Sequence, residues 1–126
     1  MTSVVGIDAV DIQRIARMLA LSPQRFAAFA WTEAERSYCR DRPDRYATRW
    51  AAKEAVMKAL GTGFATLDPL SIEVVTVEDR IPMLRLTGEA AAEARRQHIS
   101  TWAISLTHEG NLALAVVMGT GRNSHE

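Results

Sequence analysis

Hydrophobic residues near the start of the chain follow first a strand pattern and then a helix pattern. Residues 3–10 (SVVGIDAV) are a short run rich in β-branched side chains, which predicts a strand with Asp8 near its end. From Asp11 onward, apolar residues recur three and four positions apart: Ile12, Ile15, Ala16 and Leu19. A helix is therefore expected to follow the strand directly.

Three further helices are predicted in the next part of the chain. The Ser-Pro pair at residues 22–23 suits the N-cap and first turn of a helix over LSPQRFAAFA. Thr32, followed three residues later by Glu35, is a capping box, which predicts a short helix there. Residues 43–60 open with proline, are rich in strong helix formers and precede Gly61, a suitable C-cap, so they predict the longest helix.

The second half of the chain alternates between strands and one more helix. Strands are expected at residues 71–77, 82–88, 101–108 and 112–119. The first two form a hairpin, and Thr87 then caps an alanine-rich helix. The last two are separated by Gly110-Asn111, which favours a tight turn. Residues 120–126 are expected to fray.

These elements predict an α+β fold, with helices packed against an antiparallel sheet. The chain has 126 residues, a length that suits one compact domain. We expect that domain over residues 1–119, followed by the frayed tail. No repeat, linker or low-complexity segment interrupts the sequence.

Composition and charge argue against several classes of partner. Lys plus Arg and Asp plus Glu both number 15, so the net charge is zero, and no basic excess favours a nucleic-acid backbone. No apolar run is long enough to span a bilayer. The single cysteine, Cys39, cannot form an intrachain disulfide, and MTSVVGIDAVDI lacks the pattern of a signal peptide. We expect a cytoplasmic protein that binds neither nucleic acid nor membrane.

Two carboxylates are candidates for chemistry: Asp8, where the first strand meets the first helix, and Glu54, midway along the longest helix. A structural interpretation is that Asp8 caps or turns the chain and Glu54 pairs with Lys58 one helical turn later. A functional interpretation is that both carboxylates hold one Mg²⁺ ion. Mg²⁺ takes one or two protein carboxylates and completes its shell with water and substrate phosphates.

Cations flank Glu54 on a helix that is otherwise apolar. Arg49 and Lys53 share one face of that helix, while Lys58 shares the neighbouring face with Glu54. A fully exposed face would carry more polar residues, so the helix is expected to be half-buried beside a cleft. The Gly-Thr-Gly segment at residues 61–63 serves either as a simple turn or as a place where a ligand approaches the backbone.

Polar side chains also gather where the strand over residues 101–108 meets its turn: Ser105, Thr107, His108 and Glu109. The sequence has no nucleophile elbow, no Cys-x-x-Cys pair and no P-loop. Nucleophilic hydrolysis, zinc binding and ordinary nucleotide hydrolysis therefore lack support, and metal-assisted phosphoryl chemistry remains.

Four segments, in this order, resemble the phosphopantetheinyl transferases of the holo-acyl-carrier-protein synthase type: GIDAVDIQRI, FAWTEAE, RWAAKEAVMKALGTG and ISLTHEGNLALAVVM. The resemblance implies the 4′-phosphopantetheinyl transferase fold. It implies transfer of 4′-phosphopantetheine from coenzyme A to a serine of an apo acyl carrier protein, with release of adenosine 3′,5′-bisphosphate. It also implies a homotrimer whose active sites lie between subunits. Whether the carrier serves fatty-acid or polyketide synthesis stays open.

Carried over residue by residue, the resemblance assigns the Mg²⁺ carboxylates to Asp8 and Glu54 and carrier recognition to Arg14. Catalysis would rest on Glu54, Asp8 and Lys58, with Glu54, directly or through a water, or else Glu109 taking the serine proton. The coenzyme A site would comprise Arg49, Lys53, Lys58, Gly61, Ser105 and His108. Of these, His108 would act in the neighbouring subunit's site. The sequence departs from the family in one place: many members have a glycine before the arginine that corresponds to Arg49, and this chain has Thr48 there.

Two other interpretations are weaker. A non-catalytic subunit that binds coenzyme A or the carrier protein through the same fold would not need the Asp8 and Glu54 pair. A nucleic-acid-binding α+β module would need a basic stripe, which the neutral charge balance does not favour.

Overall fold

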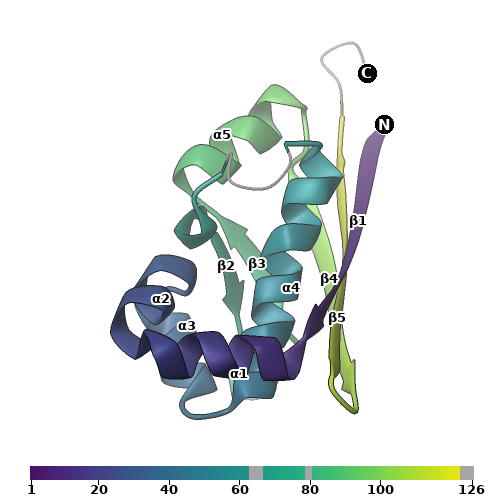
Figure 1. Ribbon diagram of the computed structural model, residues 1–126. Helices are drawn as coiled ribbons and strands as arrows, with labels where there is room; N and C mark the ends of the chain where they lie inside the picture. The colour runs from purple at the N-terminus through teal and green to yellow at the C-terminus, as the bar shows by residue number, and fades with distance from the viewer. Residues whose placement is uncertain (63–66, 79–80, 123–126) are drawn as a thin grey trace.

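A computed structural model describes residues 1–62, 67–78 and 81–122 as an α+β arrangement, as predicted (Figure 1). The elements are β1 (Thr2–Asp11), α1 (Ile12–Leu21), α2 (Pro23–Ala30), α3 (Glu33–Cys39), α4 (Pro43–Leu60), a 3₁₀ turn η1 (Pro69–Ser71), β2 (Ile72–Val75), β3 (Met83–Leu86), α5 (Gly88–Arg96), β4 (Thr101–Glu109) and β5 (Leu112–Gly121). In the described part of the chain, no helix combines the length and the apolar character needed to cross a membrane.

Two antiparallel sheets contact the long helix α4. β1, β5 and β4 form a three-stranded sheet in that order, and β2 pairs with β3 in a second sheet. α4 packs on one face of the three-stranded sheet, with α1–α3 toward one end of the molecule and α5 toward the other, near both termini (Figure 1). Both predicted hairpins are confirmed, although residues 79–80 of the first connection lie outside the described residues.

The predicted helix ends are largely confirmed. The capping box is present, since Thr32 Oγ1 accepts from Glu35 N at 3.1 Å and Glu35 Oε1 accepts from Thr32 N at 2.9 Å. Gly61 ends α4 in the left-handed conformation, with φ 69°. Ser22 and Thr87 stand at the N-cap positions of α2 and α5, but neither side chain makes a capping hydrogen bond. Gly63 lies outside the described residues.

The first and last strands are longer than predicted. β1 continues through Asp11, which caps α1 by accepting from Arg14 N at 3.0 Å, so Asp8 lies inside the strand and not at its end. β5 continues through Thr120 and Gly121, which pair with the start of β1 although the sequence pattern assigns them to the tail. Residues 123–126 of that tail lie outside the described residues.

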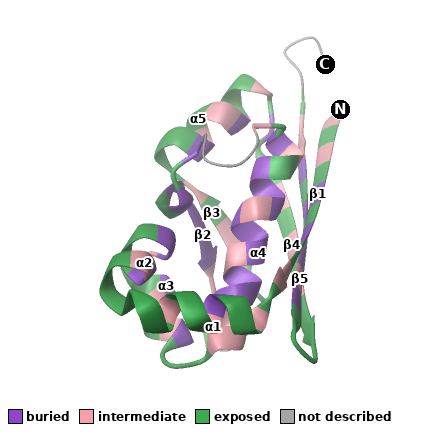
Figure 2. Cartoon of the chain, viewed as in Figure 1, coloured by how far each residue is buried: buried purple, intermediate pink, exposed green. Residues whose placement is uncertain are grey.

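Helix α4 is buried on most sides, which corrects the expectation of a half-buried helix (Figure 2). One hydrophobic cluster, which includes Val56, Ile72 and Val117, fills the space between α4, the sheet and the β2–β3 hairpin. A second cluster around Trp31 and Tyr46 lies under α1–α3. Close packing around α4 therefore fixes the positions of its charged side chains.

Gly6 lets α4 lie directly against β1. A Cβ at this position would stand 1.9 Å from the carbonyl oxygen of Ala55, a backbone atom that cannot swing aside. Asp8, two residues along the same strand and therefore on the same face, is brought against α4 by this contact.

Candidate active site

Asp8 on β1 and Lys58 on α4 form an ion pair where the two elements meet. Lys58 Nζ lies 2.7 Å from Asp8 Oδ1 and donates to the Ile7 carbonyl at 3.2 Å. The Asp8 side chain is only 8% exposed, and among the described residues its second oxygen, Oδ2, is buried without a hydrogen-bond partner. A buried carboxylate oxygen without a donor is unfavourable, so this position suits an added cation.

Glu54 lies beside Asp8, and its protonation responds to that neighbour. Burial, followed by the closeness of the Asp8 carboxylate, raises the pKa of Glu54 to about 7, although Trp50 and Lys58 oppose the rise. Two adjoining carboxylates cannot both ionise without a free-energy cost. Two details of the structural interpretation differ from the structure: Asp11, not Asp8, caps the helix, and the close ion pair of Lys58 is made with Asp8, although its charge also acts on Glu54.

This pair fits a hard divalent cation with few protein ligands. In residues 1–62, 67–78 and 81–122, no three His, Cys, Asp or Glu side chains gather closely enough to hold a metal ion by themselves. Mg²⁺ does not require such a cluster, since one or two carboxylates suffice when water and substrate phosphates supply the other ligands. Asp8 Oδ2 and the Glu54 carboxylate match that requirement.

Lys53 is not accessible to a ligand. Its side chain is fully buried, and Nζ donates to Glu35 Oε1 at 2.8 Å, to the Pro69 carbonyl at 2.9 Å and to the Ile72 carbonyl. All three ammonium protons are therefore used inside the protein. Burial lowers the pKa of Lys53, against the opposing effect of Glu35. The structure contradicts the prediction that Lys53 contacts a coenzyme A phosphate.

A second group of cations lines a pocket of about 300 Å³ beside α4. We call it the basic pocket; it is lined by Arg42, Arg45, Arg49 and His108, among other residues. The guanidinium carbons of Arg45 and Arg49 lie 4.7 and 4.5 Å from the centroid of the Tyr38 ring. In the described part of the chain, Arg49 Nε is buried without a hydrogen-bond partner. The stacking on Tyr38 holds both guanidinium groups in place beside the pocket.

Asp44 is the acidic residue among those lining the basic pocket. It accepts two hydrogen bonds from Arg42, at 3.1 and 3.0 Å, and lies 3.7 Å from His108 Nε2. Burial would raise the pKa of Asp44, but Arg42 and His108 outweigh that effect and lower it. One carboxylate among three arginines leaves the pocket with positive charge, which suits a phosphate.

Within one chain, the basic pocket and the Asp8–Glu54 pair lie apart. Asp8 is on β1 and His108 is on β4, with β5 between them. Because adjacent strands are about 4.8 Å apart, these two strands are separated by about 10 Å. Arg49 and Glu54 are five positions apart on α4, or about 140° around its axis. The predicted site residues do not all converge in a single chain.

The other predicted residues take varied positions. Arg14 is exposed on α1 and, with Glu54, lines a pocket of about 180 Å³. Gly61 is the exposed C-cap of α4. Ser105 and Glu109 are both exposed on β4, and neither lines the pocket that contains Glu54. Of these four residues, Arg14 is the one that shares a pocket with Glu54.

Two arginines of the basic pocket were missed by the sequence-based prediction. Arg42 and Arg45 precede Arg49 by seven and four positions, so the three recur at helical spacing. That periodicity is a signal for a basic face, and it could have identified the pocket before the structure was known.

Replacing Gly6 with alanine is expected to separate the two sides of the candidate site. The added Cβ would push α4 away from β1, because the obstructing atom is the Ala55 carbonyl oxygen. A displacement near 1 Å commonly lowers catalysis about a hundredfold. We expect Gly6→Ala to lower the kcat/KM of any reaction catalysed at this site by about that factor and to destabilise the fold by about 1–3 kcal/mol. Ser3→Ala, at an exposed position of the same strand, is the control, and a wild-type rate for Gly6→Ala would contradict the assignment.

Comparison with known proteins places this geometry in a family. The family model described as the 4′-phosphopantetheinyl transferase superfamily matches residues 4–117. The holo-acyl-carrier-protein synthase of Herpetosiphon aurantiacus is 42% identical, over 94% of this chain and 98% of its own. That of Anaeromyxobacter dehalogenans (strain 2CP-C) is 45% identical, over 93% of this chain and 94% of its own.

Solved structures agree with the sequence comparison. The holo-acyl-carrier-protein synthase of Helicobacter pylori in complex with coenzyme A has a TM-score of 0.83 at 28% identity, covering 92% of this chain and 99% of its own. The acyl carrier protein synthase of Mycobacterium tuberculosis has a TM-score of 0.74 at 37% identity, covering 94% of this chain and 97% of its own.

Proposed function

This chain belongs to the 4′-phosphopantetheinyl transferase superfamily, and we propose that Asp8 and Glu54 form the centre at which it modifies an apo acyl carrier protein. Its reaction transfers 4′-phosphopantetheine from coenzyme A to a serine of the carrier and releases adenosine 3′,5′-bisphosphate. The observation that carries the site assignment is the pair of adjoining carboxylates, one of which has a buried oxygen that accepts no hydrogen bond from any described residue. A cytoplasmic location is part of the proposal.

Asp8 and Glu54 would hold Mg²⁺, which would neutralise the pyrophosphate of coenzyme A and make its β-phosphorus more electrophilic. The serine Oγ forms a bond to that phosphorus as the bond to the bisphosphate oxygen breaks, and the serine proton passes to a base. Glu54 is our candidate base, directly or through a water, because it lies beside Asp8 and lines the pocket that it shares with Arg14. Glu109 is less suited, since it does not line the pocket of Glu54.

The cations near each end of the site would hold the phosphates. Lys58, paired with Asp8 and 57% exposed, is placed to offset charge that develops on the departing phosphate. The basic pocket, with Arg49 and His108, would take another phosphate of coenzyme A. Lys53 has no part in this proposal, because its ammonium is used by Glu35 and two backbone carbonyls.

We also propose that the active protein is a homotrimer with composite sites. The outer face of the three-stranded sheet exposes Val5, Ile7, Val116 and Met118, with exposed fractions of 68%, 60%, 39% and 49%. Val5 pairs with Met118 and Ile7 pairs with Val116, so these side chains form one apolar patch that suits an interface. The family resemblance implies that a neighbouring copy brings its His108 to the Asp8–Glu54 pair, which lies apart from the basic pocket of its own chain. The threefold symmetry rests on the family resemblance.

Mixed assembly is expected to restore activity to two inactive variants. Glu54→Ala removes a metal carboxylate, and His108→Ala removes a side chain of the basic pocket. If the two variants are unfolded together and refolded, some interfaces pair an intact Glu54 with an intact His108, so part of the carrier modification should return. Refolding each variant alone is the control. No recovery in trimers shown to be mixed would mean that each site lies within one chain. A monomer by light scattering at micromolar concentration would contradict the proposed trimer interface.

Charge reversal at Arg14 is expected to weaken carrier recognition and to spare coenzyme A. Arg14 is exposed on α1 beside the pocket of Glu54, where the acceptor serine must approach. We expect Arg14→Glu to raise the KM for an acidic carrier about tenfold or more at low salt, with the effect shrinking as salt increases. Calorimetry of coenzyme A binding is the control. An equal loss of coenzyme A affinity would contradict this role.

A further inference from the structure

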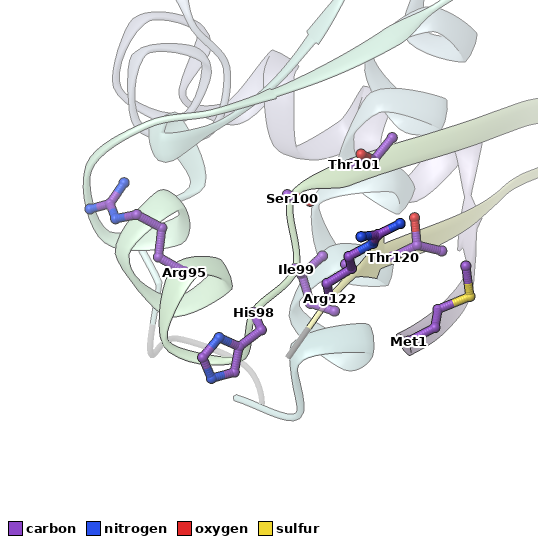
Figure 3. Close-up of a pocket in the computed structure, with 9 residues that line it drawn as sticks. Met1, Arg95, His98, Ile99, Ser100, Thr101, Thr120 and Arg122 are labelled. Carbon is purple, nitrogen blue, oxygen red and sulfur yellow. The ribbon is translucent and has the colours of Figure 1, made fainter. Parts of the chain in front are cut away.

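The two ends of the three-stranded sheet differ in how their polar groups are arranged. Near the chain termini lies a pocket of about 670 Å³, in which the Arg95 guanidinium and the His98 imidazole point away from Arg122 (Figure 3). These groups do not converge on one ligand. At the opposite end, the turn between β4 and β5 lies beside the start of α1 (Figure 1), and its polar groups make definite contacts with that helix.

Asn111, in the β4–β5 turn, binds the first turn of α1 with both its backbone and its side chain. Its carbonyl oxygen accepts from Ile12 N at 2.9 Å, and its Oδ1 accepts from Gln13 N at 2.9 Å. Its Nδ2 donates to Asp11 Oδ1 at 2.7 Å, and the same oxygen accepts from Arg14 N at 3.0 Å. The first three N–H groups of α1 are therefore held by Asn111, directly or through Asp11.

The hairpin turn itself does not call for asparagine at this position. The two-residue loop has Gly110 at φ 56°, whereas Asn111 is not among the described non-glycine residues with a positive φ. A positive φ at the first loop residue alone is the pattern of a type II′ turn, whose second residue has a φ that most residues adopt. The specific contribution of the Asn111 side chain is therefore its contact with α1.

The segment that Asn111 holds forms part of the pocket that contains Glu54. Asp11 and Arg14 both line that pocket, and Arg14 is the third residue of α1. The first N–H groups of a helix have no partner within the helix, so the first turn depends on capping groups. Without the Asn111 side chain, Gln13 N would lose its acceptor and Asp11 would lose the donor that orients it. Arg14 would then be less firmly placed beside Glu54.

We propose that Asn111 is a positioning residue for carrier recognition, because it holds the first turn of α1 and thereby fixes Arg14 at the pocket of Glu54. The inference rests on the proposed function, in which Arg14 meets an acidic carrier protein. An arginine that is already in place binds its partner without the free-energy cost of ordering that part of the chain. The loss of Asn111 should therefore act on carrier binding and not on the chemical step.

Steady-state kinetics of Asn111→Ala test this role. Alanine keeps the backbone hydrogen bond to Ile12 and removes both side-chain hydrogen bonds. We expect the KM for the carrier to rise about three- to tenfold, with kcat and the affinity for coenzyme A unchanged. Asn111→Asp should raise this KM at least as much, because an ionised carboxylate cannot donate to Asp11 and repels it. Asp68→Ala, which removes an exposed cap from Leu70 N at 3.0 Å, is the control for lost stability and should keep the wild-type KM.

A double-mutant cycle with Arg14→Ala separates this role from a general structural one. If Asn111 acts by placing Arg14, Asn111→Ala should raise the carrier KM by less than about twofold in the Arg14→Ala background. An equal rise in both backgrounds would overturn the inference. A wild-type KM in Asn111→Ala, or an equal rise in Asp68→Ala, would do the same while leaving the proposed function in place. A wild-type chain that modifies no carrier would overturn the proposed function, and this inference with it.

Discussion

Replacing either carboxylate, as Asp8→Ala or Glu54→Ala, is expected to lower kcat/KM for carrier modification by about a thousandfold or more, with the fold intact. Each change removes a candidate metal carboxylate. Neither removes a structural partner that the fold requires, because Lys58 is largely exposed and Asp8 Oδ2 has no hydrogen-bond partner among the described residues. The measurement is carrier modification followed across a Mg²⁺ titration.

Two controls sharpen this test. Glu109→Ala removes the alternative base from an exposed position and should modify the carrier at close to the wild-type rate. The free energy of unfolding of metal-free Asp8→Ala and Glu54→Ala should be unchanged or higher, because each change removes the charge repulsion between the two adjoining carboxylates. Near-normal turnover of either variant without added metal would contradict the assignment of both carboxylates to a metal site.

The shifted pKa of Glu54 gives the same pair a signature that does not depend on turnover. Its folded-state pKa of about 7 exceeds the ordinary 4.5, so the protonated form stabilises metal-free protein below pH 4.5, and this contribution is lost as the pH rises through 7. Asp8→Asn removes one cause of the rise and should lower the pKa of Glu54, although burial should keep it above 4.5. Carbon-detected NMR of the Glu54 carboxyl measures this directly.

Loss of the Lys53 ammonium is expected to destabilise the fold rather than to weaken ligand binding. Lys53→Met would leave the buried Glu35 carboxylate without its ion-pair partner and the carbonyls of Pro69 and Ile72 without this donor. Breaking a buried ion pair by removing one partner costs about 3–5 kcal/mol. We expect a decrease of that size in the free energy of unfolding, measured by urea titration.

Lys58→Met provides the matched control, because it makes the same chemical change on the same helix at an exposed position. It should change stability little and carrier modification strongly. A Lys53→Met variant with wild-type stability and weakened coenzyme A binding would show that Lys53 is a ligand contact after all.

Local sequence signals were sufficient to predict most of the fold. Thr32 with Glu35, and Gly61 after a run of helix formers, are short-range signals, and the structure confirms both. The start of α1 was also predicted, but its cap was not, because Asp8 and Asp11 both precede the helix and the pairing of β1 with β5 decides which one ends the strand. The close contact at Gly6 depends on α4, about 50 residues later in the chain.

Predicting the site required information that periodicity does not carry. On the helix alone, Glu54 and Lys58 are ideally spaced to pair, yet Lys58 pairs with Asp8 on another element. Lys53 shares a helix face with Arg49, but its acceptors come from α3 and from the segment around η1, so its burial depends on tertiary packing. The family resemblance identified Asp8 and Glu54 correctly as neighbours, and it did not distinguish an accessible lysine from a buried one.

The most direct test of the central assignment is to incubate the purified protein with coenzyme A, Mg²⁺ and an apo acyl carrier protein and to weigh the carrier by mass spectrometry. The wild-type chain should add one phosphopantetheine group to the carrier serine, while Asp8→Ala and Glu54→Ala should leave the carrier unmodified. A wild-type chain that binds coenzyme A but leaves the carrier mass unchanged would favour a non-catalytic binding subunit, and full modification by either carboxylate variant would contradict the site proposed here.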